Sequence, residues 1–270
     1  MRYEKFDVRC EGSQDDAALY VYILDRSEEI LVKSRPMIVI CPGGAYLGTS
    51  DREAEIVAMQ FLAMGYHAAV LRYSVKPAVF PAANLELGKS MVLIREHAQD
   101  WGVENDKIVV TGFSAGGHMA ASYCMFWNQG FIAQKLGVSP ALLRPSGMVL
   151  GYPVITSGEY AHHDSIKNLL GAEYEEKKEQ MSLEKCVNQD VPRSFIWHTY
   201  EDDLVPVQNS ILLVDALVKA KIPTEFHMFA KGGHGLSLAN RMTQNQWFGV
   251  EPTCQPWVEL LHNWLEAWCV

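Results

Sequence analysis

Residues 108–117 read IVVTGFSAGG and hold the pattern G-x-S-x-G near their centre. An apolar, β-branched run ends at Thr111, and the small residues from Gly116 onward are typical of a closely packed helix. A strand that turns sharply into a helix forces the serine between them into a strained backbone and lifts its hydroxyl above the sheet. Ser114 is therefore the candidate nucleophile. The alternative is a serine that merely caps a helix after a glycine-rich turn.

Short apolar runs recur along the rest of the chain and alternate with helical patterns. Runs of this length suit strands that are buried on both faces of a parallel sheet. We expect such strands at residues 37–41, 68–71, 108–111, 148–150, 195–198 and 225–229, with 19–24 as a further edge strand. Helical patterns cover residues 52–64, 81–98, 116–127, 209–220 and the segment after Pro256. The alternation predicts an α/β fold, with one domain over residues 1–270 around a mostly parallel sheet.

One stretch, residues 155–192, interrupts this alternation. It is polar and contains a run of charges from Glu173 to Glu179. A solvated helical excursion accounts for this composition. A small cap over a site at the strand ends is compatible with it, because the outer face of a cap can be solvated. We therefore expect a cap insertion at residues 155–192 within the single domain.

A serine needs a neighbouring base to become a nucleophile, and His234 is the best-placed histidine. It lies between glycines in AKGGHG, residues 230–235, directly after the last expected strand. His162, His163 and Asp164 could suggest a metal site, but this cluster lacks the further ligands that zinc sites space along a chain. We expect neither a metal nor a cofactor.

The acid of a serine triad should lie between the serine and the histidine in chain order. Residues 198–206 read HTYEDDLVP and follow an expected strand, so three adjacent acids compete there. Asp202 fits best, because Val205 and Pro206 then start the next helix. Asp203 is the second choice and Glu201 the third.

The turn CPGGAY, residues 41–46, follows the first strong strand. A Gly-Gly turn exposes backbone N–H groups that can donate to an ester carbonyl oxygen as it gains charge. The N–H of Ala115 would supply a second donor. An ordinary tight turn is the alternative explanation of Gly43 and Gly44. A phosphate loop is excluded, because the chain contains no G-x-x-x-x-G-K-[ST].

The charge balance and the cysteines limit the partners and the compartment. Lys and Arg number 23 and Asp and Glu 32, which gives a net charge of −9 and argues against nucleic acid or an anionic membrane as the main partner. No apolar run approaches the roughly 20 residues of a membrane span. The N-terminal residues lack the apolar core of a secretory signal. The six cysteines lie far apart without a C-x-x-C pair, so we expect free thiols in a reducing cytoplasm.

The ordered set PGGAY, GFSAGGH, GYPV, HTYEDDLVP and GGHG carries a family resemblance. It resembles α/β-hydrolase esterases, in particular acetyl-xylan-esterase-like carboxylesterases related to the hormone-sensitive-lipase group, over residues 36–268. The resemblance implies an α/β-hydrolase fold with Ser114 as nucleophile, His234 as base and Asp202 as its orienting acid. It also implies oxyanion donors at Gly44, Ala45 and Ala115. Pro42 departs from the pattern, because the wider group has histidine there.

The function predicted is that of a serine carboxylesterase for short acyl groups, and the resemblance extends this to acetylated sugars. We expect a small-molecule ester as partner, and the sequence is also compatible with a homo-oligomer. Gly43, Tyr46 and Tyr152 are the expected substrate contacts, since the two tyrosines would crowd the acyl side. A serine peptidase or a lipase is the alternative within enzymes, although a long-chain lipase would need a larger apolar lid than residues 155–192 offer. A non-catalytic binding protein on the same fold is the alternative from another class.

Overall fold

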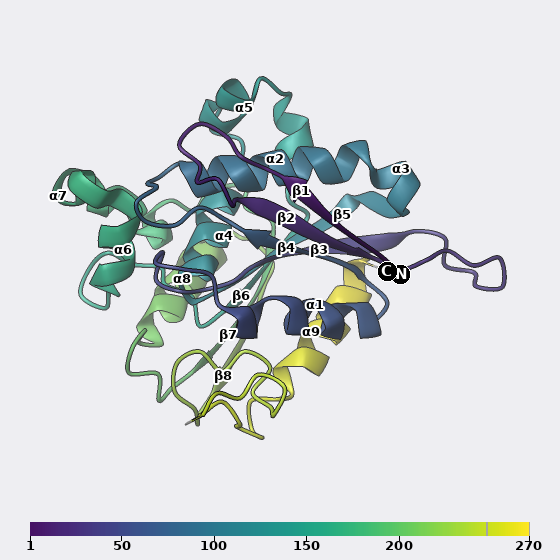
Figure 1. The fold of residues 1–270 in the computed structure, drawn as a ribbon. Coiled ribbons are helices and arrows are strands. Elements are labelled where there is room, and N and C mark those ends of the chain that lie inside the picture. Colours follow the sequence, from purple (N-terminus) through teal and green to yellow (C-terminus); the bar gives the residue numbers. More distant parts are fainter. Residues whose placement is uncertain (247, 270) are drawn as a thin grey trace.

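An eight-stranded sheet forms the centre of the computed structural model, which describes residues 1–246 and 248–269 (Figure 1). The strand order is β1-β2-β4-β3-β5-β6-β7-β8. Strands β3 to β8 run parallel, whereas β2 is antiparallel to both of its neighbours. The strands are β1 Arg2–Asp7, β2 Ala18–Ile23, β3 Arg35–Cys41, β4 His67–Arg72, β5 Val103–Phe113, β6 Gly147–Gly151, β7 Arg193–Thr199 and β8 Thr224–Phe229. The predicted mostly parallel α/β sheet is therefore confirmed.

Helices cover both faces of the sheet, because the central strands are apolar on both sides (Figure 1). On one face, Met37 and Val39 of β3 share a core with α2, α4 and α8. On the other, Ile38 and Ile40 of the same strand pack in a core with α1 and α9. The helices are α1 Glu55–Ala63, α2 Ala82–Glu96, α3 Ala98–Trp101, α4 Ser114–Phe126, α5 Phe131–Leu136, α6 His163–Leu170, α7 Tyr174–Lys177, α8 Gln208–Lys219 and α9 Trp257–Cys269.

The first strand corrects the expected edge of the sheet. β1 pairs along its whole length with β2, so the strand predicted as the edge is second from it. The sequence of β1 carries no apolar alternation, and most of its residues are exposed. Backbone pairing and the contact of the Tyr3 ring with Tyr20 and Tyr22 hold it in place.

The helix expected at residues 52–64 is divided in two. A 3₁₀ turn, Asp51–Glu53, precedes α1, and Ala54 separates them with φ −113° and ψ −110°, outside the helical region. The break rotates Glu53 into the protein, where it is buried, while Glu55 at the start of α1 is exposed.

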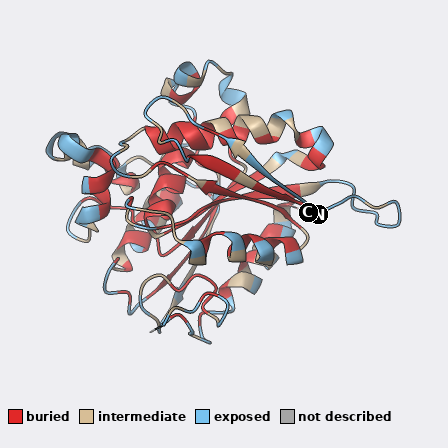
Figure 2. Cartoon of the chain, in the orientation of Figure 1, coloured by how far each residue is buried: buried red, intermediate tan, exposed pale blue. Residues whose placement is uncertain are grey.

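The loops that follow the parallel strands gather at one edge of the sheet. Parallel strands point their carboxyl ends the same way, so the segments after β3, β5, β6, β7 and β8 meet there. Residues 155–192, which connect β6 to β7, contain α6, α7 and short 3₁₀ turns. Figure 2 shows a mostly buried sheet and exposed outer turns on this connection.

Among the described residues, no helix combines the length and the apolar character that crossing a bilayer requires.

Candidate active site

Ser114 lies on the sharp turn between β5 and α4. Its φ is +53°, in the left-handed region that residues with a side chain rarely occupy. Gly112 makes the turn possible, because a Cβ at this position would lie 2.2 Å from the carbonyl oxygen of Gly116. Strand and helix therefore approach within a distance that only glycine permits, and Ser114 stands at the start of the helix.

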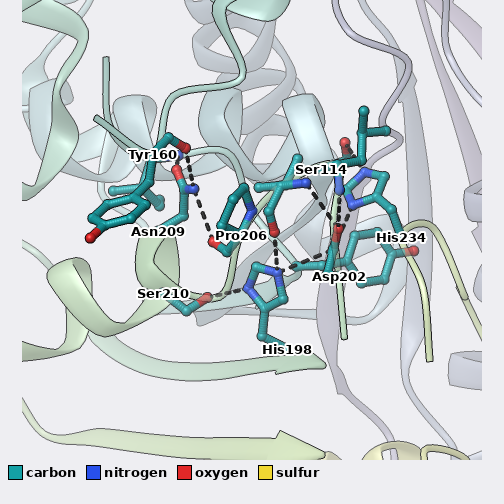
Figure 3. Close-up of polar contacts among 12 residues, drawn as sticks. Ser114, Tyr160, His198, Asp202, Pro206, Asn209, Ser210 and His234 are labelled. Atoms are coloured by element: carbon teal, nitrogen blue, oxygen red, sulfur yellow. Dashed lines mark hydrogen bonds and ion pairs between the residues drawn. The ribbon is translucent and has the colours of Figure 1, made fainter. Parts of the chain in front are cut away.

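A continuous chain of hydrogen bonds connects Ser114, His234 and Asp202. Ser114 Oγ lies 2.7 Å from His234 Nε2, and His234 Nδ1 lies 2.7 Å from Asp202 Oδ2. Figure 3 shows the three side chains in this order. The ring can donate Nδ1–H to the carboxylate, which leaves Nε2 to accept the serine proton. The three residues come from the loops after β5, β8 and β7, so parallel strands bring them together although 120 positions separate Ser114 from His234.

Asp202 is held as an ionised acid in a buried position. Its side chain is fully buried, and burial alone would raise its pKa. Hydrogen bonds from His198, His234 and the N–H of Val205 outweigh burial and hold the pKa well below its ordinary value. Oδ1 also accepts the N–H groups of Leu204 and Val205, at 3.1 and 2.9 Å, which fixes the loop.

The other two candidates for the acid of the triad, Asp203 and Glu201, lie in different surroundings and, within the described chain, form no hydrogen bond with His234. Asp203 is exposed and borders the cavity described below, whereas Glu201 forms an ion pair with Lys231 at 2.6 Å. Asp202 is the acid that contacts His234.

His198 is a second histidine on the Asp202 carboxylate, and the sequence argument did not assign it a role. Its Nε2 lies 3.2 Å from Asp202 Oδ2 and 2.9 Å from the carbonyl oxygen of Val205, so Nε2 carries a proton. Its Nδ1 lies 2.8 Å from Ser210 Oγ, which can donate to it (Figure 3). A histidine at the end of a strand and four residues before an acid was the available signal.

The turn after β3 lies beside Ser114. Gly44 and Ala45 border the cavity, and within the described chain their N–H groups donate to no other residue. The N–H of Gly43 donates to Glu53 Oε2 at 2.7 Å, so it is not free for a ligand. Ala115 occupies the first turn of α4, where helix N–H groups lack intrahelical acceptors. Gly44, Ala45 and Ala115 are therefore the backbone groups of this region that fit oxyanion donors.

A cavity of about 900 Å³ opens above Ser114. It is bordered by the turn after β3, by His162 of the 155–192 segment, and by the loops that hold Asp202 and His234. Its wall mixes apolar and polar groups, including Arg52, Glu251, Leu204 and Phe248. The guanidinium of Arg52 lies over the Phe248 ring, 5.1 Å from its centroid.

The expected substrate contacts Gly43, Tyr46 and Tyr152 lie behind the cavity wall, which corrects that expectation. Tyr46 is 2% exposed, and its hydroxyl lies 3.0 Å from His118 Nδ1. Tyr152 is 1% exposed and donates to Glu53 Oε1 at 2.6 Å. Both tyrosines follow their strands with positive φ, so the backbone turns where an ordinary strand would have continued. They support the loops and do not border the cavity.

His162 and His163 contact different partners. His162 Nδ1 lies 2.8 Å from Ser165 Oγ and borders the cavity, whereas His163 Nδ1 lies 3.2 Å from the Tyr174 hydroxyl. Among the described residues, no group of three or more His, Cys, Asp or Glu side chains is arranged to hold a metal ion. Of these two histidines, His162 is therefore the one that borders the cavity.

Asn209 of α8 fixes the start of the 155–192 segment. Its Oδ1 accepts the N–H groups of Ile155 and Thr156, at 2.9 and 3.1 Å. Its Nδ2 donates to the carbonyl oxygens of Tyr160 and Pro206, at 2.9 and 3.0 Å (Figure 3). One fully buried amide thus connects this segment to the loop that carries Asp202.

Comparison with known proteins shows the family of the chain. The BD-FAE family matches residues 27–217. The chain is 36% identical over 227 residues to endo-1,4-beta-xylanase B of Butyrivibrio fibrisolvens, a match that covers 80% of this chain and 35% of that protein. The chain spans from about a third to about half of the length of the curated relatives that it matches.

Solved structures match the chain over nearly its whole length. The acetyl ester-xyloside bifunctional hydrolase from Caldicellulosiruptor lactoaceticus is 33% identical, with a TM-score of 0.78 over 93% of this chain and 88% of that chain. A carboxylesterase from Lactobacillus plantarum WCFS1 is 26% identical, with a TM-score of 0.85 over 99% of this chain and 98% of that chain. The resemblance to α/β-hydrolase esterases is thereby confirmed, and the chain belongs to the BD-FAE family of α/β hydrolases.

Proposed function

We propose that this protein is a serine carboxylesterase in which Ser114, His234 and Asp202 form the catalytic triad. The observation that carries the proposal is the pair of 2.7 Å contacts that connects the serine hydroxyl, the imidazole and the buried carboxylate. A serine hydroxyl becomes nucleophilic when a base accepts its proton, and the base needs an acid that fixes its tautomer. A base and an acid in hydrogen-bond contact, beside a cavity that Ser114 borders, support the proposal.

The reaction then proceeds in two steps through an acyl-enzyme. Ser114 Oγ attacks the ester carbonyl carbon while His234 Nε2 takes the hydroxyl proton, and the C=O electrons move to the oxygen. The N–H groups of Gly44, Ala45 and Ala115 stabilise this oxyanion. The tetrahedral intermediate collapses, the C–O bond to the alcohol breaks, and His234 returns the proton to the leaving alcohol. A water molecule, deprotonated by the same histidine, then hydrolyses the acyl-serine.

Short acyl groups, acetyl in particular, are the proposed substrates, with a hydroxyl-rich alcohol such as a sugar. The polar side chains on the cavity wall, Arg52, His162, Asp203 and Glu251, support this choice, because sugar hydroxyls can exchange hydrogen bonds with them. The relative from C. lactoaceticus, an acetyl ester-xyloside bifunctional hydrolase, supports the same choice.

The remaining predictions about organisation belong to this proposal. Residues 155–192 would act as a cap within a single domain, supported by His162 on the cavity wall and by the Asn168 amide, which donates to the carbonyl oxygen of Ala45 at 2.9 Å. All six cysteines are free, which suits a reducing compartment such as the cytoplasm. A homo-oligomer stays a prediction.

The experiment is a profile of kcat/KM for p-nitrophenyl esters from acetate to decanoate, with an aminoacyl-anilide alongside. Each methylene that is buried in an open apolar channel adds about 0.8 kcal/mol, so kcat/KM in a lipase would rise steadily with chain length. We expect instead a maximum at acetate or propionate and a fall beyond about four carbons, where steric cost exceeds the transfer free energy. A rise of kcat/KM through octanoate would favour a lipase. Faster cleavage of the anilide than of the esters would favour a peptidase. A chain that turns over none of these compounds would favour a binding protein.

A further inference from the structure

Glu53 is a buried carboxylate at the active site that the proposed reaction does not use. It ends the 3₁₀ turn Asp51–Glu53, is 4% exposed and borders the cavity. A carboxylate in such a position is costly unless hydrogen bonds replace its hydration. Both of its oxygens accept such a bond, and the two donors belong to different loops of the site.

The first hydrogen bond holds the turn that carries the oxyanion donors. Gly43 donates its N–H to Glu53 Oε2 at 2.7 Å, and the Gly43 carbonyl oxygen accepts the N–H of Ser50 at 2.8 Å. The segment around Glu53 therefore fixes Gly43 on both sides of its Cα. Gly43 lies against the nucleophile, because a Cβ built on it would stand 2.8 Å from the Cβ of Ser114. A displacement of this turn would move the neighbouring N–H groups of Gly44 and Ala45 relative to the reacting carbonyl.

The second hydrogen bond holds the loop of the catalytic base. Glu53 Oε1 accepts the hydroxyl of Tyr152 at 2.6 Å, and the oxygen of that hydroxyl accepts the N–H of Ser237 at 2.8 Å. The Tyr152 ring meets the His234 imidazole nearly edge-on, with centroids 5.1 Å apart and an interplanar angle of 72°. Ser237 Oγ also donates to the carbonyl oxygen of Arg52 at 2.5 Å. The same short turn thus supports the loop that carries His234.

We propose that Glu53 is a positioning residue that keeps the oxyanion turn and His234 in a fixed relation around Ser114. The inference rests on the proposed esterase function and adds a component to it. Because both carboxylate oxygens are occupied by donors of the protein, Glu53 acts through Gly43 and Tyr152 and not as a general base. Reacting groups must be held within a fraction of an ångström, so one carboxylate that connects both loops should affect the rate of reaction more than the binding of substrate.

The test compares Glu53→Gln, Tyr152→Phe and their double variant with the matched control Glu55→Gln. Glutamine keeps the shape of Glu53, but its amide nitrogen cannot accept the bond that one of the two donors makes. Glu55 is exposed two residues away, so E55Q removes the same charge without touching the site. Loss of an oxyanion donor costs about 10²–10³ in kcat, and misplacement of donors that remain should cost less, about 10- to 100-fold in E53Q.

The first readouts are kcat and KM on p-nitrophenyl acetate, with kcat given per active site as titrated with a fluorophosphonate. The second is Ki for a trifluoromethyl ketone, which forms a tetrahedral adduct with the serine. In E53Q we expect KM within about twofold of the wild type and a Ki raised by about the same factor as the loss in kcat/KM. Y152F should lose less, about 3- to 10-fold, because Gly43 stays bound to the carboxylate. The double variant should lose less than the product of the two, since both act through one carboxylate.

A merely structural role predicts a lower melting temperature and fewer active sites, with unchanged kcat and Ki per active site. That result, or an equal loss in E55Q, overturns the inference. If E53Q does not fold, Y152F decides, and an unchanged kcat and Ki in Y152F overturn the inference. A wild-type chain that hydrolyses no ester overturns the proposed function, and the inference with it, whereas an active wild type with unaffected variants overturns the inference alone.

Discussion

The loops around Ser114 and the segment 155–192 lie at the same edge of the sheet but are held in different ways. The described chain has seven non-glycine residues with positive φ, and six of them belong to the loops around the site: Ala45, Tyr46, Ser114, Tyr152, Ser237 and Ala239. Buried hydrogen bonds fix these loops. The outer part of segment 155–192 carries exposed ion pairs, such as Lys185 with Glu179 at 2.8 Å.

This difference indicates where the fold tolerates strain. A strained residue persists when its surroundings determine its conformation completely, and such residues gather where side chains must be aimed. Surface ion pairs contribute little to stability and permit changes of sequence. We therefore expect activity to depend strongly on the first region and weakly on the second, and four substitutions can break or sharpen that contrast.

The largest effect is expected from Ser114→Ala in the first region. Loss of the nucleophile should lower kcat on p-nitrophenyl acetate by on the order of 10⁵- to 10⁶-fold, as in serine hydrolases whose triad acts as a unit. The melting temperature should stay close to that of the wild type, because alanine keeps the Cβ and the backbone. An S114A variant that retains substantial turnover would remove Ser114 from the mechanism.

Next comes Asp202→Asn, measured against its neighbour Asp203→Asn as the matched control. An amide cannot stabilise the imidazolium and selects the wrong tautomer of His234, so kcat should fall by about 10⁴-fold. D203N changes an exposed group that is proposed to contact only the sugar part of the substrate, so kcat on p-nitrophenyl acetate should stay within a few fold of the wild type. If D203N were the inactive variant, the hydrogen bond between His234 and Asp202 would not be the catalytic one.

A much smaller effect is expected from His162→Ala in the second region. His162 is the residue of segment 155–192 on the cavity wall, so its loss should affect contacts with the alcohol part of the substrate. One hydrogen bond is worth about 0.5–1.5 kcal/mol, or a fall of about 2- to 12-fold in kcat/KM. The comparison is an acetylated xylo-oligosaccharide against p-nitrophenyl acetate. A loss as large as that in D202N would place His162 in the catalytic machinery.

The smallest effect on catalysis is expected where the two regions join, at His118. This residue of α4 contacts the Tyr46 hydroxyl and, at 3.1 Å, the carbonyl oxygen of Met181 in segment 155–192. Burial lowers its pKa from 6.5 to about 4, and burial lowers the pKa of His67 to about 4 as well. The unfolded chain therefore binds these protons more readily, so stability is complete above about pH 6.5 and falls as the pH drops toward 4.

His118→Gln removes one of these two titrating groups. Denaturant unfolding at several pH values should show a decline in the free energy of unfolding between pH 6.5 and 4 that is smaller in H118Q by about 1–3 kcal/mol. At pH 8 the variant should keep most of its kcat. Equal declines in the two proteins would mean that His118 is not buried in its neutral form.

The sheet was largely predictable because its parallel strands are short, continuous apolar runs, which suit strands that are buried on both faces of a sheet. β1 was not predicted, because its sequence contains no continuous apolar run. Its side chains other than Phe6 are exposed, and its place comes mainly from backbone pairing with β2, which leaves no periodic signal. The break at Ala54 was missed as well, since residues 52–64 carry a pattern that suits one helix.

The candidate triad could be predicted because each member lies in a short motif after a strand. The order serine, acid, histidine along the chain then assigns a role to each. Glu53 and the role of Tyr152 could not be predicted, because their hydrogen bond joins two loops that are far apart in the sequence. His198 lies only four positions before Asp202, but that spacing belongs to no motif that assigns it a role. Glu53 meets Gly43 across 10 positions because the break at Ala54 turns it inward, and Tyr152 meets Glu53 across 99 positions. Tyr46 and Tyr152 were expected on the cavity wall because the positive φ at both residues is not visible in sequence.

The most direct test of the central claim is covalent labelling with a fluorophosphonate, mapped by mass spectrometry on the intact chain and its peptides. Such reagents react with a serine whose proton a neighbouring base removes, so they report the activated nucleophile and no particular substrate. We predict one adduct per chain, on the peptide that contains Ser114, with loss of esterase activity in proportion to labelling and no adduct in S114A. An adduct on another serine, or full esterase activity after Ser114 is completely labelled, would contradict the account.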